Sequence, residues 1–318
     1  MASGSIKKRR TGMAAGLISM LLIICVPVLS RASSVGLILP KDCAFSSEVK
    51  DKFSSLLREG GIKGADVLMQ RPGSDKVSRL NSMRKFLAYG VDVIVIWGGT
   101  SIKEVAGEAG KTPIVFVGVW DPVQSGIVKS LKEPGKNITG VMGQTSTAYL
   151  LDSIVESTGV KTIGIIYHSN LTDSMGQYGT IQKVAPTKGL DLLAVDLNKM
   201  SMEKAFEVLD PAPFLYLAQG CNVKDGVYEG LARMNKPAAT QNPGVTGGGV
   251  IFTLAPDMDE TIRILSEITG RILNGEKPAT IPVARNKKIN FTINVGEARR
   301  LGVKIPFGVL NRGTEVIR

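Results

Sequence analysis

The chain has 318 residues, a formal charge of +11 and 43% hydrophobic residues, which suits one large α/β domain or two lobes of ordinary size. Five of the basic residues and no acidic residue lie within residues 1–32, so the rest of the chain carries a charge of only +6. The remaining basic residues are scattered, which argues against a nucleic-acid-binding protein and leaves a charge that mainly favours solubility.

The first 32 residues have the pattern of a cleavable secretory signal peptide. A basic cluster at residues 7–10 precedes an apolar run at 13–29, and Ser30 and Ala32 place small residues three and one positions before Ser33. An uncleaved membrane anchor is the alternative, although the run is shorter than a comfortable span. Ile24 stands before Cys25, where a lipidation signal requires a small residue. We therefore expect an exported protein that diffuses freely in the periplasm of a double-membraned bacterium.

From Val35 to Met142, short apolar runs alternate with segments of helical pattern. Continuous runs of this length are typical of strands buried on both faces of a parallel sheet. Each helical segment begins at a serine that can cap it and ends at a glycine. The expected strands are 35–39, 65–69, 91–97, 113–119 and 138–142, and the expected helices are 46–59, 74–89 and 101–109. This order predicts a doubly wound parallel sheet.

The same alternation starts again after an expected helix at 146–157. The second series has expected strands at 162–167, 190–195, 214–217 and 238–241, with helices at 174–188, 202–208 and 224–234. Two successive series predict two similar lobes. The tail differs: after a strand at 249–254, Asp257 can cap a long amphipathic helix that ends at Gly275, and a short helix at 295–301 follows.

Two blocks of sequence resemble one known family. The first contains VDVIVIWGGT (91–100), TPIVFV (112–117), DPVQSGIV (121–128) and NITGV (137–141), and the second is the ending INFTINVGEARRLGVKIPFGVLNRGTEVI (289–317). Both are similar to substrate-binding proteins of ABC transporters, of the type often described as tryptophan-binding. Trp97 departs from that pattern, since the family usually has a smaller residue there.

The resemblance implies an α/β fold of the type I periplasmic binding proteins, with two doubly wound Rossmann-like lobes joined by a three-strand hinge and a ligand cleft between them. It places the N-terminal lobe at 33–143 plus 255–288 and the C-terminal lobe at 144–254 plus 289–318. It also implies a small-molecule ligand, no cofactor, and ABC permease subunits with a cytoplasmic ATPase as partners. We expect a monomer that is not an integral membrane protein.

The loop Gly98-Gly99-Thr100-Ser101 follows the expected strand 91–97. In open α/β sheets, ligands bind beyond the carboxyl ends of the strands. Glycines allow close approach of the backbone, and free amides with hydroxyls at a helix start suit a carboxylate. The alternative is a tight turn in which Ser101 only caps a helix.

Four further loops reach the same edge of the sheets, at 40–46, 120–123, 167–174 and 219–222. They supply the remaining candidate ligand-binding residues: Phe45, Ser46, Trp120, Asp121, Tyr167, Asn170, Gln219 and Asn222. An amino acid needs acceptors for its ammonium and donors for its carboxylate, which Asp121, Thr100 and Ser101 could supply. Asp121 could instead only cap the turn before Pro122.

Trp97 and Trp120 are the two tryptophans of the chain, and both end expected strands at this edge. Side by side they could stack on a planar or cationic part of a ligand. Equally, one or both could fill the core of the lobe. The hypothesis is a ligand with an aromatic or quaternary ammonium part.

Cys43 and Cys221 are expected in loops of opposite lobes, where a disulfide would hold the lobes together, so free thiols are expected. His168 is the sole histidine and is expected to make a polar contact or lie at the surface. No metal-binding or hydrolase motif is present in the sequence, so we predict neither catalytic nor metal-binding residues.

Three functions are compatible with these features. The first is a solute receptor that closes on its ligand, a small molecule such as an amino acid, and delivers it to an ABC permease. The second is an exported hydrolase of similar fold, for which the sequence offers no nucleophile and base. The third is a binding protein that feeds a sensor. The first explains the export signal and the two lobes, and it is the function that we predict.

Overall fold

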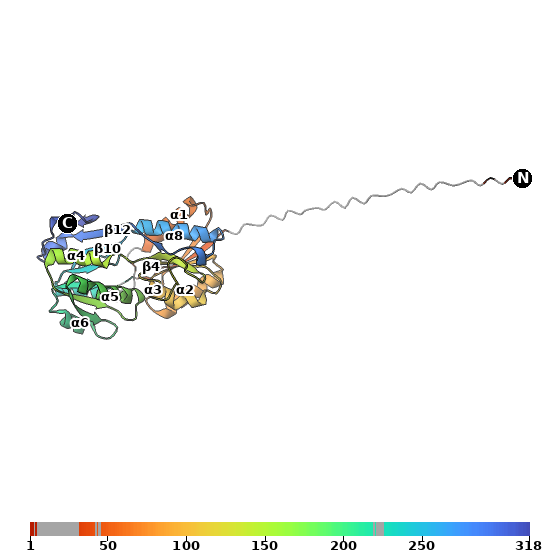
Figure 1. Ribbon diagram of the computed structural model, residues 1–318. Coiled ribbons are helices and arrows are strands. Elements are labelled where there is room, and N and C mark those ends of the chain that lie inside the picture. Colours follow the sequence, from red (N-terminus) through yellow and green to blue (C-terminus); the bar gives the residue numbers. More distant parts are fainter. Residues whose placement is uncertain (3, 5–31, 42, 44–45, 219, 221–225) are drawn as a thin grey trace. The chain divides into compact units, whose positions relative to one another are not determined.

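The computed structural model describes residues 1–2, 4, 32–41, 43, 46–218, 220 and 226–318. Residues 1–31 and 32–318 form two separate units, and the following description concerns the second. Its strands form two sheets of six and seven strands (Figure 1).

The first sheet is parallel throughout, with the strand order β11-β5-β4-β3-β1-β2. Its strands are β1 (Ser34–Ile38), β2 (Asp66–Gln70), β3 (Val93–Trp97), β4 (Ile114–Val119), β5 (Ile138–Met142) and β11 (Ala284–Arg285). Helices α1 (Ser46–Glu59) and α8 (Met258–Leu273) cover one face, and α2 (Lys76–Tyr89) and α3 (Gly99–Val105) cover the other. We refer to this sheet and its helices as the N-terminal lobe.

The second sheet has the order β13-β12-β10-β9-β8-β6-β7, and only the β10–β12 pair is antiparallel. Its strands are β6 (Thr162–Tyr167), β7 (Asp191–Asp196), β8 (Phe214–Leu217), β9 (Ala238–Thr240), β10 (Val250–Pro256), β12 (Ile289–Asn294) and β13 (Glu315–Ile317). Its helices are α4 (Thr147–Thr158), α5 (Thr172–Val184), α6 (Met202–Leu209), α7 (Val227–Met234), α9 (Val295–Arg300) and α10 (Phe307–Leu310). We refer to these elements as the C-terminal lobe.

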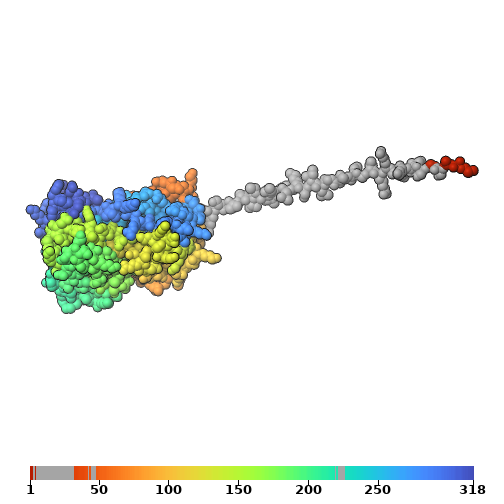
Figure 2. All heavy atoms as spheres, viewed as in Figure 1, coloured from red at the N-terminus to blue at the C-terminus, as the bar shows by residue number. Residues whose placement is uncertain are grey.

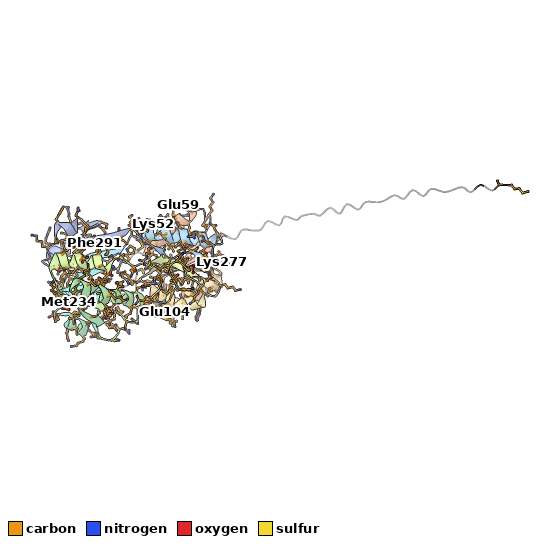
Figure 3. The ribbon with its side chains drawn as sticks, in the orientation of Figure 1. Lys52, Glu59, Glu104, Met234, Lys277 and Phe291 are labelled. Atoms are coloured by element: carbon orange, nitrogen blue, oxygen red, sulfur yellow. The ribbon has the colours of Figure 1, made fainter. Side chains whose placement is uncertain are left out.

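Both sheets have apolar side chains on both faces. In the N-terminal lobe, one core lies between the sheet and α1 with α8, and a second lies under α2 and α3. In the C-terminal lobe, α4 and α5 cover one face, and α6 and α7 cover the other. Phe291 of β12, labelled in Figure 3, packs edge-on against Tyr149 of α4 with their ring centroids 5.4 Å apart. Burial on both faces explains why the strands are continuous apolar runs, and the predicted α/β class of two doubly wound lobes is confirmed.

The chain passes between the two sheets three times: after β5, after β10 and between β11 and β12. After the second passage, α8 packs against α1, and on the face in Figure 2 its light-blue atoms lie beside the orange atoms of α1. Lys52 of α1 and Asp259 of α8 form a salt bridge across this contact. Both side chains are exposed, so apolar packing rather than the ion pair holds α8 in place.

The predicted cap at Asp257 agrees with the structure, and the predicted caps at Ser74 and Ser101 do not. Asp257 accepts a hydrogen bond from the amide of Glu260 in the first turn of α8, as predicted. Ser146, where the sequence predicted the start of a helix, caps α4 by accepting from the amide of Tyr149. Helix α2 begins after Asp75 rather than at Ser74, because the Asp75 carboxylate accepts from the Ser78 amide. Helix α3 begins at Gly99, so Ser101 lies inside the helix and the prediction of Ser101 as its cap is wrong.

Candidate ligand-binding site

A cavity lies where the carboxyl ends of strands from both lobes meet. Its walls include Trp97 at the end of β3, Trp120 directly after β4, Asp173 and Gln177 of α5, and Gln241 directly after β9. The remaining lining residues are Gly98, Gly118, Met142, Gly143, Gly220, Asn242, Pro243, Pro256, Met258 and Thr261. This is the edge at which doubly wound sheets bind ligands.

The cavity is small in this conformation, with a volume of about 50 Å³. That space holds a few water molecules. Anything as large as an amino acid requires the walls to move apart. The two lobes are in contact at this site, and we refer to this arrangement as closed.

The loop after β3 requires glycine at two positions. Gly98 has φ +85°, a left-handed conformation that glycine adopts without strain. At Gly99, an added Cβ would stand 2.6 Å from Oδ1 of Asp173, which is closer than such atoms approach. The neighbouring Thr100 Oγ1 accepts a hydrogen bond of 2.9 Å from the backbone amide of Thr172. The loop therefore touches the start of α5 in the other lobe.

Asp173 joins the two lobes at this point. Its carboxylate accepts hydrogen bonds from the backbone amides of Gly99 at 2.7 Å and of Trp120 at 2.9 Å. Burial raises the pKa of this carboxyl, while the amides of Trp120 and Gly99 act in the opposite direction. Among the residues that the structure describes, no positively charged side chain pairs with Asp173.

The two tryptophans are both buried, each with 3% of its surface exposed, and both line the cavity. Trp97 lies against Gly118, where an added Cβ would be 3.0 Å from its Nε1 atom. Trp120 extends toward α5, where its Nε1 donates to Thr180 Oγ1 at 3.1 Å. The sequence predicted their place at the strand ends, and contact with a ligand stays a prediction for both.

A buried polar network forms the C-terminal wall of the cavity. Gln241 accepts hydrogen bonds from the Tyr216 hydroxyl at 2.6 Å and from Thr147 Oγ1 at 3.0 Å, and it donates to Thr145 Oγ1 at 2.5 Å. Thr145 in turn donates to the carbonyl of Leu254 at 3.0 Å. Gln241 thereby connects the cavity to two of the segments where the chain passes between the sheets.

Four residues of the cavity wall were not predicted from the sequence: Asp173, Gln177, Gln241 and Asn242. Gln241 and Asn242 could have been found, because the rule applied to the other strand ends applies equally to the expected strand 238–241. Asp173 lay within one of the loops already selected, but the helix was expected to begin only at Ser174. Gln177 lies one turn into α5, where sequence alone gives no sign of its contact with the cavity.

Several other predicted residues lie outside the cavity wall. Asp121 accepts from the amides of Val123 and Gln124, so it caps its own turn, and with Asn170 it lines a separate groove. Tyr167 stacks on Tyr178 within the C-terminal lobe, with ring centroids 4.0 Å apart. Thr100 and Ser101 are buried in α3 next to the cavity.

Four candidate ligand-binding residues remain, namely Phe45, Ser46, Gln219 and Asn222. Ser46 is the first residue of α1. Phe45, Gln219, Asn222 and Cys221 lie outside the described residues.

Cys43 is disulfide-bonded in the structure, so the prediction of a free thiol at this position is wrong. That prediction rested on an argument about lobe motion and not on a distance, which the sequence does not supply. For His168 the sequence left a polar contact or a surface position open. The residue is buried, which excludes the surface position, and its backbone amide donates to Ser174 Oγ.

Within the described part of the chain, no helix is long and apolar enough to cross a membrane. The same residues include no group of three or more His, Cys, Asp or Glu side chains placed to hold a metal ion.

The model of the ABC transporter substrate binding protein family matches residues 46–317. A curated tyrosine-binding protein of Clostridioides difficile (strain R20291) is 22% identical over 266 residues, which cover 81% of this chain and 77% of that protein. These matches confirm the resemblance seen in the two sequence blocks.

Two solved structures show the same fold. A conserved domain protein from Vibrio cholerae has a TM-score of 0.80 at 22% identity, covering 90% of this chain and all of that one. An ABC domain in complex with L-Trp from Streptococcus pneumonia has a TM-score of 0.78 at 20% identity, with the same coverage of both chains.

Proposed function

The chain belongs to the ABC transporter substrate binding protein family, and from that premise we propose that it binds an amino acid with an aromatic side chain between its lobes and delivers it to an ABC permease. The observation that carries this proposal is Asp173, a buried carboxylate in the cavity wall with hydrogen bonds to two backbone amides. Buried charges in proteins are normally paired with an opposite charge. The ammonium group of an amino acid supplies that charge.

The groups around Asp173 suit both ends of an amino acid. Where a ligand carboxylate replaces the Asp173 carboxylate, the amides of Gly99 and Trp120 can donate to the ligand instead. The carboxylate of a bound amino acid would then accept hydrogen bonds from these amides, and its ammonium group would donate to the Asp173 carboxylate. The cavity is too small for a ligand in the present conformation, so binding requires this exchange of partners to accompany opening and closing.

The rest of the cavity wall favours a large apolar side chain. Trp97, Met142, Pro243, Pro256 and Met258 supply apolar surface. Aromatic rings and methionine sulfur contact planar side chains favourably. We place tyrosine and tryptophan first among the candidate ligands, because one relative is a tyrosine-binding protein and one similar structure is a complex with L-Trp.

We also propose the cellular setting that the sequence predicts. Residues 1–32 would be removed on export, and a monomer with lobes at 33–143 plus 255–288 and at 144–254 plus 289–318 would act in the periplasm. Gel filtration and mass spectrometry of the secreted protein test the monomer and the cleavage site.

A thermal-shift screen of the natural amino acids and of simple amines tests the proposed function. A ligand that binds only the folded state at a hundred times its Kd adds about 2.7 kcal/mol, which for a chain of this size raises the Tm by roughly 5 °C. We expect tryptophan, tyrosine or phenylalanine to give the largest rise. The proposal is wrong if no amino acid or amine changes the Tm.

A further inference from the structure

Trp120 belongs to the N-terminal lobe but is seated on a helix of the C-terminal lobe. Its indole Nε1 donates to Thr180 Oγ1 at 3.1 Å, and its backbone amide donates to Asp173 Oδ1 at 2.9 Å. Both acceptors belong to α5. The side chain is 3% exposed, so its N–H requires the partner that α5 provides.

One face of α5 is shaped for the indole ring. Asp173, Gly176 and Thr180 are spaced three and four residues apart, which places them on the same side of the helix. At Gly176, an added Cβ would stand 2.7 Å from Cδ1 of Trp120 and 3.2 Å from Cγ. The absence of a side chain at Gly176 therefore leaves the room in which the ring lies.

The rest of α5 shows that this contact is local. Gly179 lies on the same helix, and nothing is within 4 Å of where its Cβ would be. Thr180 Oγ1 uses its own hydrogen to donate to the carbonyl of Gly176 at 2.8 Å, so a lone pair of the oxygen accepts from the indole. The bond to Gly176 thereby fixes the orientation of the Thr180 hydroxyl, so that its oxygen can accept from the indole of Trp120.

We infer that Gly176 and Thr180 form a seat for Trp120 and that Trp120 is a positioning residue that fixes the closed arrangement of the lobes. The indole Nε1 is bonded to Thr180, and the ring occupies the space that a side chain at Gly176 would need, while Trp120 also forms part of the cavity wall. Because the seat joins residues of two lobes, it exists only when they are closed. It therefore contributes to how slowly a bound ligand leaves. The inference rests on the proposed function only for that last consequence.

The matched pair Gly176→Ala and Gly179→Ala tests the seat without a ligand. Both changes add one methyl group to the same helix, and only the first collides with the ring. The chain contains two tryptophans, so 5-fluorotryptophan labelling gives two ¹⁹F resonances, and Trp97→Phe assigns them. We expect the Trp120 resonance to be shielded from solvent in the wild type and Gly179→Ala, and exposed in Gly176→Ala.

Ligand measurements extend the same comparison. With the best amino acid from the thermal screen, Gly176→Ala should raise the dissociation rate at least tenfold, and Gly179→Ala should change it less than twofold. Thr180→Val, which removes the acceptor, should weaken binding about fivefold, and Thr180→Ser, which keeps it, should restore binding. Circular dichroism of each variant checks that the fold is kept.

The outcomes for the seat and for the proposed function are distinct. Equal ¹⁹F solvent exposure of Trp120 in the two glycine variants would overturn the seat, whatever ligand is bound. A wild-type Trp120 that is exposed both without ligand and with every amino acid tested would also overturn it. Failure of all amino acids and amines to bind, with Trp120 still shielded, would overturn the proposed function alone.

Discussion

The carboxylate of Asp173 lies 2.7 Å from the backbone amide of Gly99, although the two residues are 74 positions apart in the chain and belong to lobes built on different sheets. The contact brings the loop after β3 against the start of α5 and forms part of the cavity wall. Two consequences follow. A side chain at Gly99 must disturb the site, and the ionisation of Asp173 must affect the stability of the closed protein.

Gly99→Ala should weaken amino-acid binding at least tenfold, because its Cβ would stand 2.6 Å from Asp173 Oδ1. Gly107→Ala is the control, since nothing lies within 4 Å of its Cβ and it follows the same helix. Isothermal titration calorimetry with the best ligand from the screen measures both. If the two variants bound the ligand with equal affinity, Gly99 would not be part of the binding site.

The stability of the ligand-free protein should depend on the proton of Asp173. Burial raises the pKa of this carboxyl above its ordinary value of 3.8, so the folded state binds the proton more tightly than the unfolded chain. Its ionisation therefore lowers the free energy of unfolding as the pH rises from 3.8 through the raised pKa, and has no such effect below 3.8.

Asp173→Asn isolates this effect, because the amide keeps an oxygen acceptor and never ionises. Urea denaturation of both proteins from pH 3.5 to 7 gives the difference in their free energies of unfolding. We expect this difference to move in favour of the variant as the pH rises. Carboxyls whose pKa values are lowered, such as Asp196 and Asp257, are common to both proteins and cancel. A difference independent of pH would contradict the raised pKa.

Tyr216→Phe should lower the free energy of unfolding by about 1 kcal/mol, the usual contribution of one buried hydrogen bond. The change removes the 2.6 Å bond to Gln241, whose oxygen keeps the bond from Thr147. Tyr89→Phe, at an exposed tyrosine, is the control and should have no effect. Denaturant unfolding measures both variants. If Tyr216→Phe left the free energy of unfolding unchanged, the network would not stabilise the cavity wall.

The fold could be predicted from local patterns because each strand is buried on both faces. Continuous apolar runs and capping residues such as Ser146 and Asp257 mark the elements without any knowledge of their neighbours. The site could be predicted only in part. The place of Trp97, Gly98 and Trp120 follows from the rule that loops after parallel strands meet at one edge.

The missed features depend on contacts between distant residues. Whether Asp121 or Asp173 lies in the cavity depends on which backbone amides donate to each carboxylate. Asp121 accepts from the amides of Val123 and Gln124 in its own turn. The direction of the Trp120 ring depends on the space at Gly176, 56 residues later in the chain. The bond at Cys43 likewise depends on a distance that no local pattern contains.

The central claim is that the Asp173 carboxylate recognises the ammonium group of an aromatic amino acid. Calorimetry tests this claim directly. The wild type and Asp173→Asn are each titrated with the best aromatic amino acid and with its analogue that lacks the amino group. For tryptophan this analogue is indole-3-propionate. We predict that the wild type prefers the amino acid at least tenfold and that Asp173→Asn loses this preference while still folding. Equal wild-type affinity for the two compounds would contradict the claim.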